Sequence, residues 1–183
     1  SDAENCRDLT EEKGGVCQKV CPAGCSDFND RDEEVKVKVG NIVVATGFQT
    51  FDASRIKEYG YGKFPNVLTS LEFERLINAA GPTGGEIRLR TQDKKGNWIF
   101  EKDSGEPQKL ALIHCIGSRD QNFHSYCSRV CCMYSLKLAH LVKEKLPDAE
   151  VSEYYIDMRA FGKGYEEFYD RIRQEGIRMV RGR

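Results

Sequence analysis

The chain has 183 residues, of which 39% are hydrophobic and 31% are charged, and its formal net charge is -1. This size and balance are typical of one ordinary globular domain with a short appendage. A net charge near zero does not favour nucleic-acid binding by the chain as a whole. No apolar segment approaches the length needed to span a membrane. Eight cysteines without a secretory signal indicate a reducing compartment, so we expect a cytoplasmic protein whose cysteines ligate a metal or cluster.

Residues 1–34 are interpreted as an acidic arm that carries half of the cysteines: Cys6, Cys17, Cys21 and Cys25. Pro22 follows Cys21, and a C-x3-C-P ending is typical of bacterial ferredoxin runs, where the last cysteine often ligates a second cluster. Ten residues separate Cys6 from Cys17, so the full ferredoxin spacing is absent. A zinc knuckle and a disordered tail are the alternatives, and which of these cysteines share a cluster stays open.

Two strands are predicted at the start of the region 35–108. The first is a segment of alternating apolar and charged residues, 34–40, and the second is an apolar segment, 41–48, with Ala45, Thr46 and Gly47 near its end. Small residues at a strand end let a ligand approach the backbone closely, and open α/β sheets bind ligands at the carboxyl ends of their strands. Ala45 to Gly47 are therefore a candidate ligand contact, with a simple turn as the alternative.

The rest of this region is less regular. We predict a helix over 70–80 with Ser70 as its N-cap, ended by Gly81 and Pro82. Segments 86–90 and 97–101 are predicted to form a hairpin around the turn 93–96.

Residues 109–183 show an α/β pattern. The predicted elements are a strand at 109–114, a helix at 127–145, a strand at 150–157, a helix at 165–175 and a strand at 177–181. This β-α-β-α-β order is typical of the nucleotide-binding half of a doubly wound fold, with a parallel sheet and right-handed crossovers. The turn after the first strand keeps only one glycine, Gly117, which argues against an NAD(P)-binding domain.

Four cysteines lie between the first strand and the first helix of this unit, at C-x11-C-x3-C-C spacing: Cys115, Cys127, Cys131 and Cys132. A helix N-terminus offers unpaired N–H groups and a partial positive charge, which favour thiolates and anionic clusters. Arg119 and Arg129 add to that positive field. Sulfur ligands in this number suit an iron–sulfur cluster or zinc.

Three alternatives compete with a cluster at these cysteines: buried small hydrophobic residues, a disulfide framework and a zinc site. Structural zinc usually takes paired C-x2-4-C hooks, which the adjacent Cys131 and Cys132 do not match. Consecutive residues of a helix point about 100° apart, so both sulfurs reach one cluster only with altered local geometry. We therefore expect the helix to begin at or after this pair, with Cys127 to Cys132 in a turn.

Three segments, 115–120, 126–134 and 157–169, together resemble the A subunit of heterodisulfide reductase and its bacterial relatives in quinone-interacting and electron-bifurcating complexes. The resemblance runs from about Val39 to the C-terminus. It implies a Rossmann-like unit of a thioredoxin-reductase-like flavoprotein, in which Cys115, Cys127, Cys131 and Cys132 hold an unusual [4Fe–4S] cluster. It also implies that Ala45, Thr46 and Gly47 lie near FAD, and that the arm is the last part of a ferredoxin-like domain.

The family's N-terminal G-x-G-x-x-G turn is not in this sequence, so we expect a piece of a larger subunit with an incomplete FAD site, inactive in isolation. The function expected from the resemblance is electron relay between FAD and partner iron–sulfur clusters. The expected partners are the other subunits of such a complex and an electron-donating hydrogenase or dehydrogenase subunit. The alternative is a zinc-stabilised interaction module without redox activity.

Overall fold

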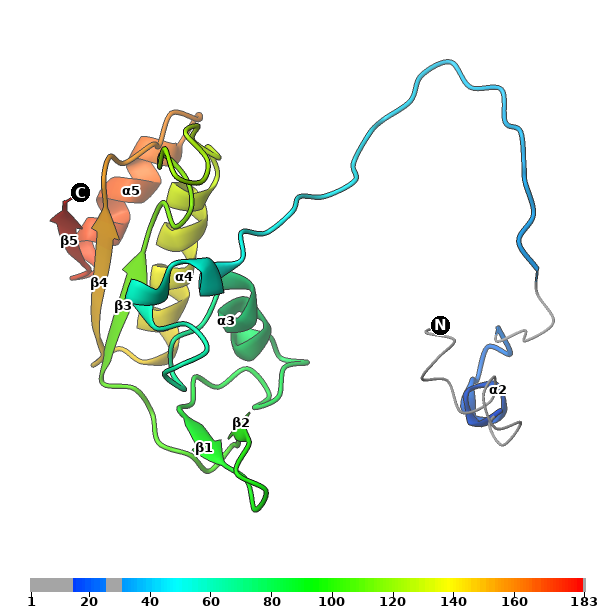
Figure 1. The fold of residues 1–183 in the computed structure, drawn as a ribbon, viewed down its shortest axis with the longest axis horizontal. Helices are drawn as coiled ribbons and strands as arrows, with labels where there is room; N and C mark the ends of the chain where they lie inside the picture. The colour runs from blue at the N-terminus through cyan, green and yellow to red at the C-terminus, as the bar shows by residue number, and fades with distance from the viewer. Residues whose placement is uncertain (1–14, 26–30, 183) are drawn as a thin grey trace. The chain divides into compact units, whose positions relative to one another are not determined.

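The computed structural model describes residues 15–25 and 31–182. The chain divides into two compact units, Ser1–Gly47 and Phe48–Arg183, which are considered separately (Figure 1). In the first unit the described residues form one short helix, α2 (Val16–Val20), and residues 31–47 form neither helix nor strand.

The two strands predicted over 34–48 are therefore wrong for this structure. Val35, Val37, Ile42 and Val43 are all exposed, with 68% to 89% of each residue accessible to solvent. An extended segment is held in a sheet by hydrogen bonds to a neighbouring strand, and no strand in the described part of the chain pairs with this one. Alternating hydrophobicity alone does not supply that partner.

The second unit is built on a parallel sheet in the order β3-β4-β5, formed by β3 (Lys109–Ile113), β4 (Glu150–Tyr155) and β5 (Arg178–Arg181). Leu110 pairs with Val151, and Ser152 pairs with Arg178. Helices α4 (Cys131–Lys145) and α5 (Tyr165–Gln174) connect the strands (Figure 1). The predicted α/β class and the parallel pairing of these strands are confirmed, with boundaries within four residues of those expected.

One apolar cluster joins the two helices to the sheet. Leu136 and Val142 of α4 pack with Val151 of β4 and Ile172 of α5, and all four are buried. A helix over 127–145, as predicted, would also place Val130 on this inward face, but Val130 is 68% exposed because it precedes the helix as its N-cap. The helical period therefore applies only from Cys131 onward.

Two smaller elements precede the sheet. Helix α3 (Ser70–Ile77) begins after Thr69, whose hydroxyl accepts from the Glu72 N–H at 3.3 Å while the Glu72 carboxylate accepts from the Thr69 N–H at 2.7 Å. The N-cap is thus Thr69 rather than the predicted Ser70, because a capping box places its acidic residue three positions after the cap.

The predicted hairpin is present, but its first strand begins at Arg90, where the predicted strand 86–90 was expected to end, and its second strand is shorter than expected. Strands β1 (Arg90–Gln92) and β2 (Trp98–Phe100) pair antiparallel around the turn 93–96. Two 3-10 turns, η1 (Ala53–Arg55) and η2 (Lys57–Tyr59), complete the described elements of this unit. Among the described residues, every helix is too short or too polar to cross a bilayer.

Candidate functional site

The four central cysteines lie at the carboxyl edge of the parallel sheet, on a segment that we call the cysteine loop, residues 114–132, which includes the start of α4. Cys115 comes two residues after the end of β3, and Cys131 and Cys132 are the first two residues of α4. The helix therefore begins at the adjacent pair, as predicted, but Cys131 and Cys132 lie in the helix itself, so the turn predicted over 127–132 is wrong for these two residues. The unpaired N–H groups of this helix end favour negative charge on its first turn.

The backbone of the cysteine loop is strained. In the described part of the chain, the non-glycine residues with positive φ are Cys115 at 59°, Arg119 at 58° and Arg129 at 70°, and all three belong to this loop. Left-handed backbone is costly for residues with a Cβ and persists only where the surroundings hold it in place. Such strain is concentrated at functional sites.

Internal hydrogen bonds hold part of this shape. The Arg119 N–H donates to the Tyr126 carbonyl at 3.0 Å, the Asp120 N–H donates to the His124 carbonyl at 3.0 Å, and the His124 N–H donates to the Gly117 carbonyl at 3.2 Å. The chain between Gly117 and Tyr126 therefore folds back on itself in a compact turn that contains a parallel bridge between Ser118 and His124.

An aromatic residue from outside the loop supports this turn. Phe51 packs edge-on against Phe123, with ring centroids 5.2 Å apart, and the Arg55 guanidinium lies 4.9 Å from the Phe123 centroid. Gly117 has a φ of 73°, and a Cβ there would come within 2.4 Å of the Phe51 ring. Glycine is thus required at this position for two reasons, backbone conformation and close packing.

The cysteine side chains interact with one another. A hydrogen bond from Cys132 lowers the pKa of Cys131 to about 5, and the same bond together with burial raises the pKa of Cys132 well above its usual range. Burial raises the pKa of the Cys115 thiol, and the neighbouring Cys131 and Cys127 sulfurs raise that pKa further. The loop thus brings the four cysteines into interaction with one another and lowers the pKa of Cys131.

The four cysteines differ in how deeply they are buried. Cys132 is buried, with its Sγ 3.7 Å from the Asp157 carbonyl oxygen, whereas Cys115, Cys127 and Cys131 are half-buried. The Arg129 N–H donates to Cys127 Sγ at 3.4 Å. Cys115 also lines a solvent-open pocket of about 660 Å³ at the ends of β3 and β4. Within residues 15–25 and 31–182, no three His, Cys, Asp or Glu side chains are arranged to hold a single metal ion.

The N-terminal arm is organised differently. Cys6 lies outside the described residues; Cys17 is on α2, and Cys21 and Cys25 follow it. Cys21 Sγ and Cys25 Sγ are 3.2 Å apart, and hydrogen bonds from the Cys25 backbone and thiol lower the pKa of Cys21 to about 7. Cys17 and Cys25 are exposed. These contacts are all local in sequence.

The predicted ligand contact at Ala45, Thr46 and Gly47 is exposed coil in the first unit. Gly47 has a φ of 78°, with no atom within 4 Å of a Cβ built there. The structure does not place these three residues at the end of a strand.

Sequence reasoning missed a buried histidine–glutamate pair beside the loop. His114 and Glu153 have fully buried side chains, and the imidazole Nε2 hydrogen-bonds to a Glu153 carboxylate oxygen. Burial raises the pKa of Glu153, while the hydrogen bond from His114 opposes that shift. The available signal was the two-residue period of β4, which places Glu153 on the same inward face as Val151.

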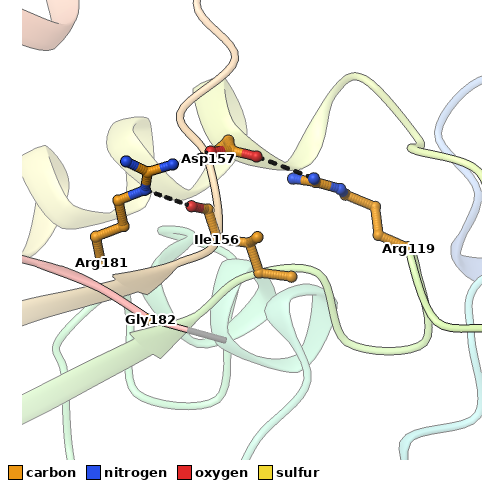
Figure 2. Close-up of a pocket in the computed structure, with 5 residues that line it drawn as sticks. All are labelled: Arg119, Ile156, Asp157, Arg181 and Gly182. Atoms are coloured by element: carbon orange, nitrogen blue, oxygen red, sulfur yellow. Dashed lines mark hydrogen bonds and ion pairs between the residues drawn. The ribbon is translucent and has the colours of Figure 1, made fainter.

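Asp157 was also missed as an individual residue, although it lies in a segment that carried the family resemblance. One carboxylate oxygen accepts from Arg119 Nη2 at 2.9 Å, and the other accepts from Arg181 Nη2 at 2.7 Å. Figure 2 shows Asp157 between these two arginines, at an open pocket of about 480 Å³ that Ile156 and Gly182 also line. The two hydrogen bonds, from Arg119 first, hold the pKa of Asp157 below its usual range.

No protein-family model matches the chain. It is 47% identical over 170 residues to the A subunit of H(2):CoB-CoM heterodisulfide,ferredoxin reductase of Methanothermobacter thermautotrophicus, covering 92% of this chain and 24% of that protein. It is 50% identical over 162 residues to the first iron–sulfur A subunit of CoB--CoM heterodisulfide reductase of Methanopyrus kandleri, covering 86% of this chain and 23% of that protein.

A third relative, the iron–sulfur A subunit of CoB--CoM heterodisulfide reductase of Methanocaldococcus jannaschii, is 46% identical over 171 residues, with 92% of this chain and 24% of the relative covered. The chain thus spans about a quarter of the length of the curated relatives that it matches. Over this segment, the chain belongs to the family of heterodisulfide reductase A subunits.

Proposed function

We propose that this chain carries an electron-transfer site of a heterodisulfide-reductase-type oxidoreductase, and that its four central cysteines hold a [4Fe–4S] cluster: Cys115, Cys127, Cys131 and Cys132. The observation that carries the proposal is the strained backbone of the cysteine loop, which returns to the start of α4 at the edge of the sheet, so that Cys115 interacts with Cys131 and Cys127. Relatives from Methanopyrus kandleri are named iron–sulfur subunits, which supports this chemistry.

The donor set fits such a cluster. Soft thiolates are the usual ligands of [4Fe–4S] centres, which take four cysteines. Because each cysteine binds a different iron, the four sulfurs surround a group larger than one ion, so a tight single-ion arrangement is not required. Cys115, in the strained and partly exposed loop, lines a solvent-open pocket, so there is open space beside its sulfur.

The bound cluster supplies one-electron transfer; the chain's own groups set its charge environment. The N-terminus of α4 and the Arg119 guanidinium place positive charge beside the sulfurs. Positive charge stabilises the reduced, more negative state and so raises the reduction potential. Arg129, which is exposed, acts chiefly through its backbone N–H to Cys127.

The remaining assignments rest on the family. Ala45, Thr46 and Gly47 would contribute to an FAD site that residues beyond this segment complete, and the cluster would relay electrons between FAD and partner clusters. The other subunits of the complex and an electron-donating hydrogenase or dehydrogenase subunit are its partners, in the reducing cytoplasm. Residues 1–34 are a ferredoxin-like arm whose ligands are Cys6, Cys17, Cys21 and Cys25, residues 35–108 belong to the FAD domain, and 109–183 form the Rossmann-like domain that carries the central cluster.

Anaerobic purification of the intact subunit that contains this chain tests the proposal. We expect a brown protein with iron and acid-labile sulfide in equal amounts, and a visible absorption that bleaches on reduction. A colourless protein that contains zinc and no sulfide would contradict the proposal and support the zinc-stabilised interaction module instead.

A further inference from the structure

We propose that Asp157 is a positioning residue that aims the Arg119 guanidinium at the cysteine site, and that Nη1 of Arg119 donates a hydrogen bond to a sulfur of the bound cluster. The proposal rests on the proposed function, because it needs a cluster at the central cysteines. It assigns a role to a carboxylate that ligates nothing itself.

The first observation is a buried donor atom. Arg119 Nη2 is occupied by the Asp157 carboxylate at 2.9 Å, but Arg119 Nη1 is buried and has no hydrogen-bond partner in the described part of the chain. Guanidinium nitrogens are donors only and stay charged at every physiological pH, so a buried Nη1 without an acceptor is unfavourable. Its burial therefore points to an acceptor that the protein side chains do not provide.

The second observation concerns which acceptor lies nearby. Arg119 stands in the cysteine loop between Cys115 and Cys127, and after Asp157 these two sulfurs contribute to the raised pKa of Arg119. Asp157 already accepts from Nη2, and Cys115 and Cys127 are the next groups that act on the charge of Arg119. The acceptor class that fits Nη1 is thus a thiolate or sulfide of the cluster.

The third observation is how firmly Asp157 is fixed. Its second carboxylate oxygen accepts from Arg181 Nη2 at 2.7 Å, and Arg181 Nε donates to the Ile156 carbonyl at 3.0 Å (Figure 2). The Asp157 carbonyl oxygen also lies 3.7 Å from Cys132 Sγ. Asp157 thereby connects β5, the start of α4 and the middle of the cysteine loop, where Arg119 holds a φ of 58°.

This arrangement predicts the sign of an electrostatic effect. Removal of the Asp157 negative charge alone would raise the cluster potential, because the reduced state carries more negative charge. Release of Arg119 would lower it, because an aimed N–H donor to sulfur is lost. The amide of an Asp157→Asn variant keeps the shape but not the charge-assisted bonds to two guanidinium groups, so Arg119 is released. The proposal requires the second effect to exceed the first.

The test is an EPR-monitored redox titration of the intact, anaerobically purified subunit. The signal that disappears in the Cys131→Ser variant identifies the central cluster. We expect Asp157→Asn and Arg119→Gln each to shift the midpoint potential of this cluster to a more negative value. In the Arg119→Gln background, Asp157→Asn should lower the potential no further. Asp170→Asn, a surface carboxylate that pairs with Arg173 within α5 at 3.6 Å, is the matched control and should leave the potential unchanged.

A positive shift or no shift for Asp157→Asn would overturn the proposal. If that variant does not retain its cluster, Arg119→Lys with arginine labelled by ¹⁵N at the guanidinium nitrogens only decides: the wild type should show a ¹⁵N coupling to the reduced cluster, and the lysine variant should lose it. A wild type without this coupling also overturns the proposal. A subunit that has no signal dependent on Cys131 contradicts the proposed function itself, so the two failures are distinguishable.

Discussion

The two cysteine-bearing regions of this chain are built in opposite ways. In the arm, Cys21 and Cys25 are four positions apart and contact each other next to a five-residue helix, so the contacts of these cysteines come from residues nearby in the sequence. In the cysteine loop, the sulfurs are gathered by residues far away in sequence, such as Phe51 and Asp157. A site with long-range supports is formed by the fold before any ligand binds, whereas a site with local contacts depends more on the ligand for its shape.

Serine substitutions in the two regions give the largest expected contrast. Cys131→Ser and Cys132→Ser should each abolish or strongly alter the EPR signal of the central cluster, because both sulfurs stand on the first turn of α4 beside Cys115. Cys25→Ser, in the arm, should leave that signal unchanged. If both loop variants keep an unaltered signal and full iron content, the assigned ligands are wrong.

The buried pair beneath the loop should give the next largest effect. His114→Ala leaves the Glu153 carboxylate buried without its partner, so we expect a loss of about 3–5 kcal/mol in the free energy of unfolding. The matched control is His140→Ala, because His140 pairs with Glu175 at 2.8 Å on a partly exposed surface and should cost about 1 kcal/mol or less. Denaturant unfolding of both variants measures the difference, and equal losses would contradict a structural role for the buried pair.

The sequence predicted the local features of this site well. The cysteine site, the strand before it and the helix after it could be predicted, because hydrophobic periodicity and ligand spacing depend on residues that are close together in the sequence. The contacts that hold the loop in place could not be predicted, because they join residues far apart in the sequence: Phe51 lies 66 positions before Gly117, and Asp157 lies 38 positions after Arg119. Such contacts are decided by the tertiary fold. The strands predicted over 34–48 failed for the same reason, because pairing depends on a partner strand that local pattern does not reveal.

Glycine substitutions separate the two kinds of region in a further way. Gly117→Ala forces a left-handed φ on alanine and places its Cβ against the Phe51 ring, so we expect about 2–4 kcal/mol of destabilisation and reduced occupancy of the central cluster. Gly24→Ala in the arm carries a φ of 60° but meets no atom within 4 Å, so it should cost only about 1–2 kcal/mol locally. Iron content and thermal unfolding of the two variants measure this contrast. Similar iron losses at both positions would show that loop packing does not set the site.

The smallest expected effect lies at a local contact that the sequence pattern does encode, the capping box of α3. Burial raises the pKa of Glu72, but hydrogen bonds from Thr69 and Arg90 lower it more, so the net pKa lies below the usual value for glutamate. An acid with a lowered folded-state pKa contributes stability above its unfolded pKa, and this stability is lost as the pH falls through the folded pKa. Stability should therefore decline in the acid range below about pH 4.5.

Thr69→Ala removes the cap and weakens this dependence. We expect a loss of about 1 kcal/mol near neutral pH and a smaller loss in acid, where the wild-type contact is itself weakened. Ser70→Ala, at the position that the sequence analysis took for the cap, is the matched control and should change stability by only a few tenths of a kcal/mol. Denaturant midpoints measured from neutral pH to about pH 3 test both expectations, because a Thr69→Ala loss that stays constant across this range would exclude Glu72 as the titrating partner.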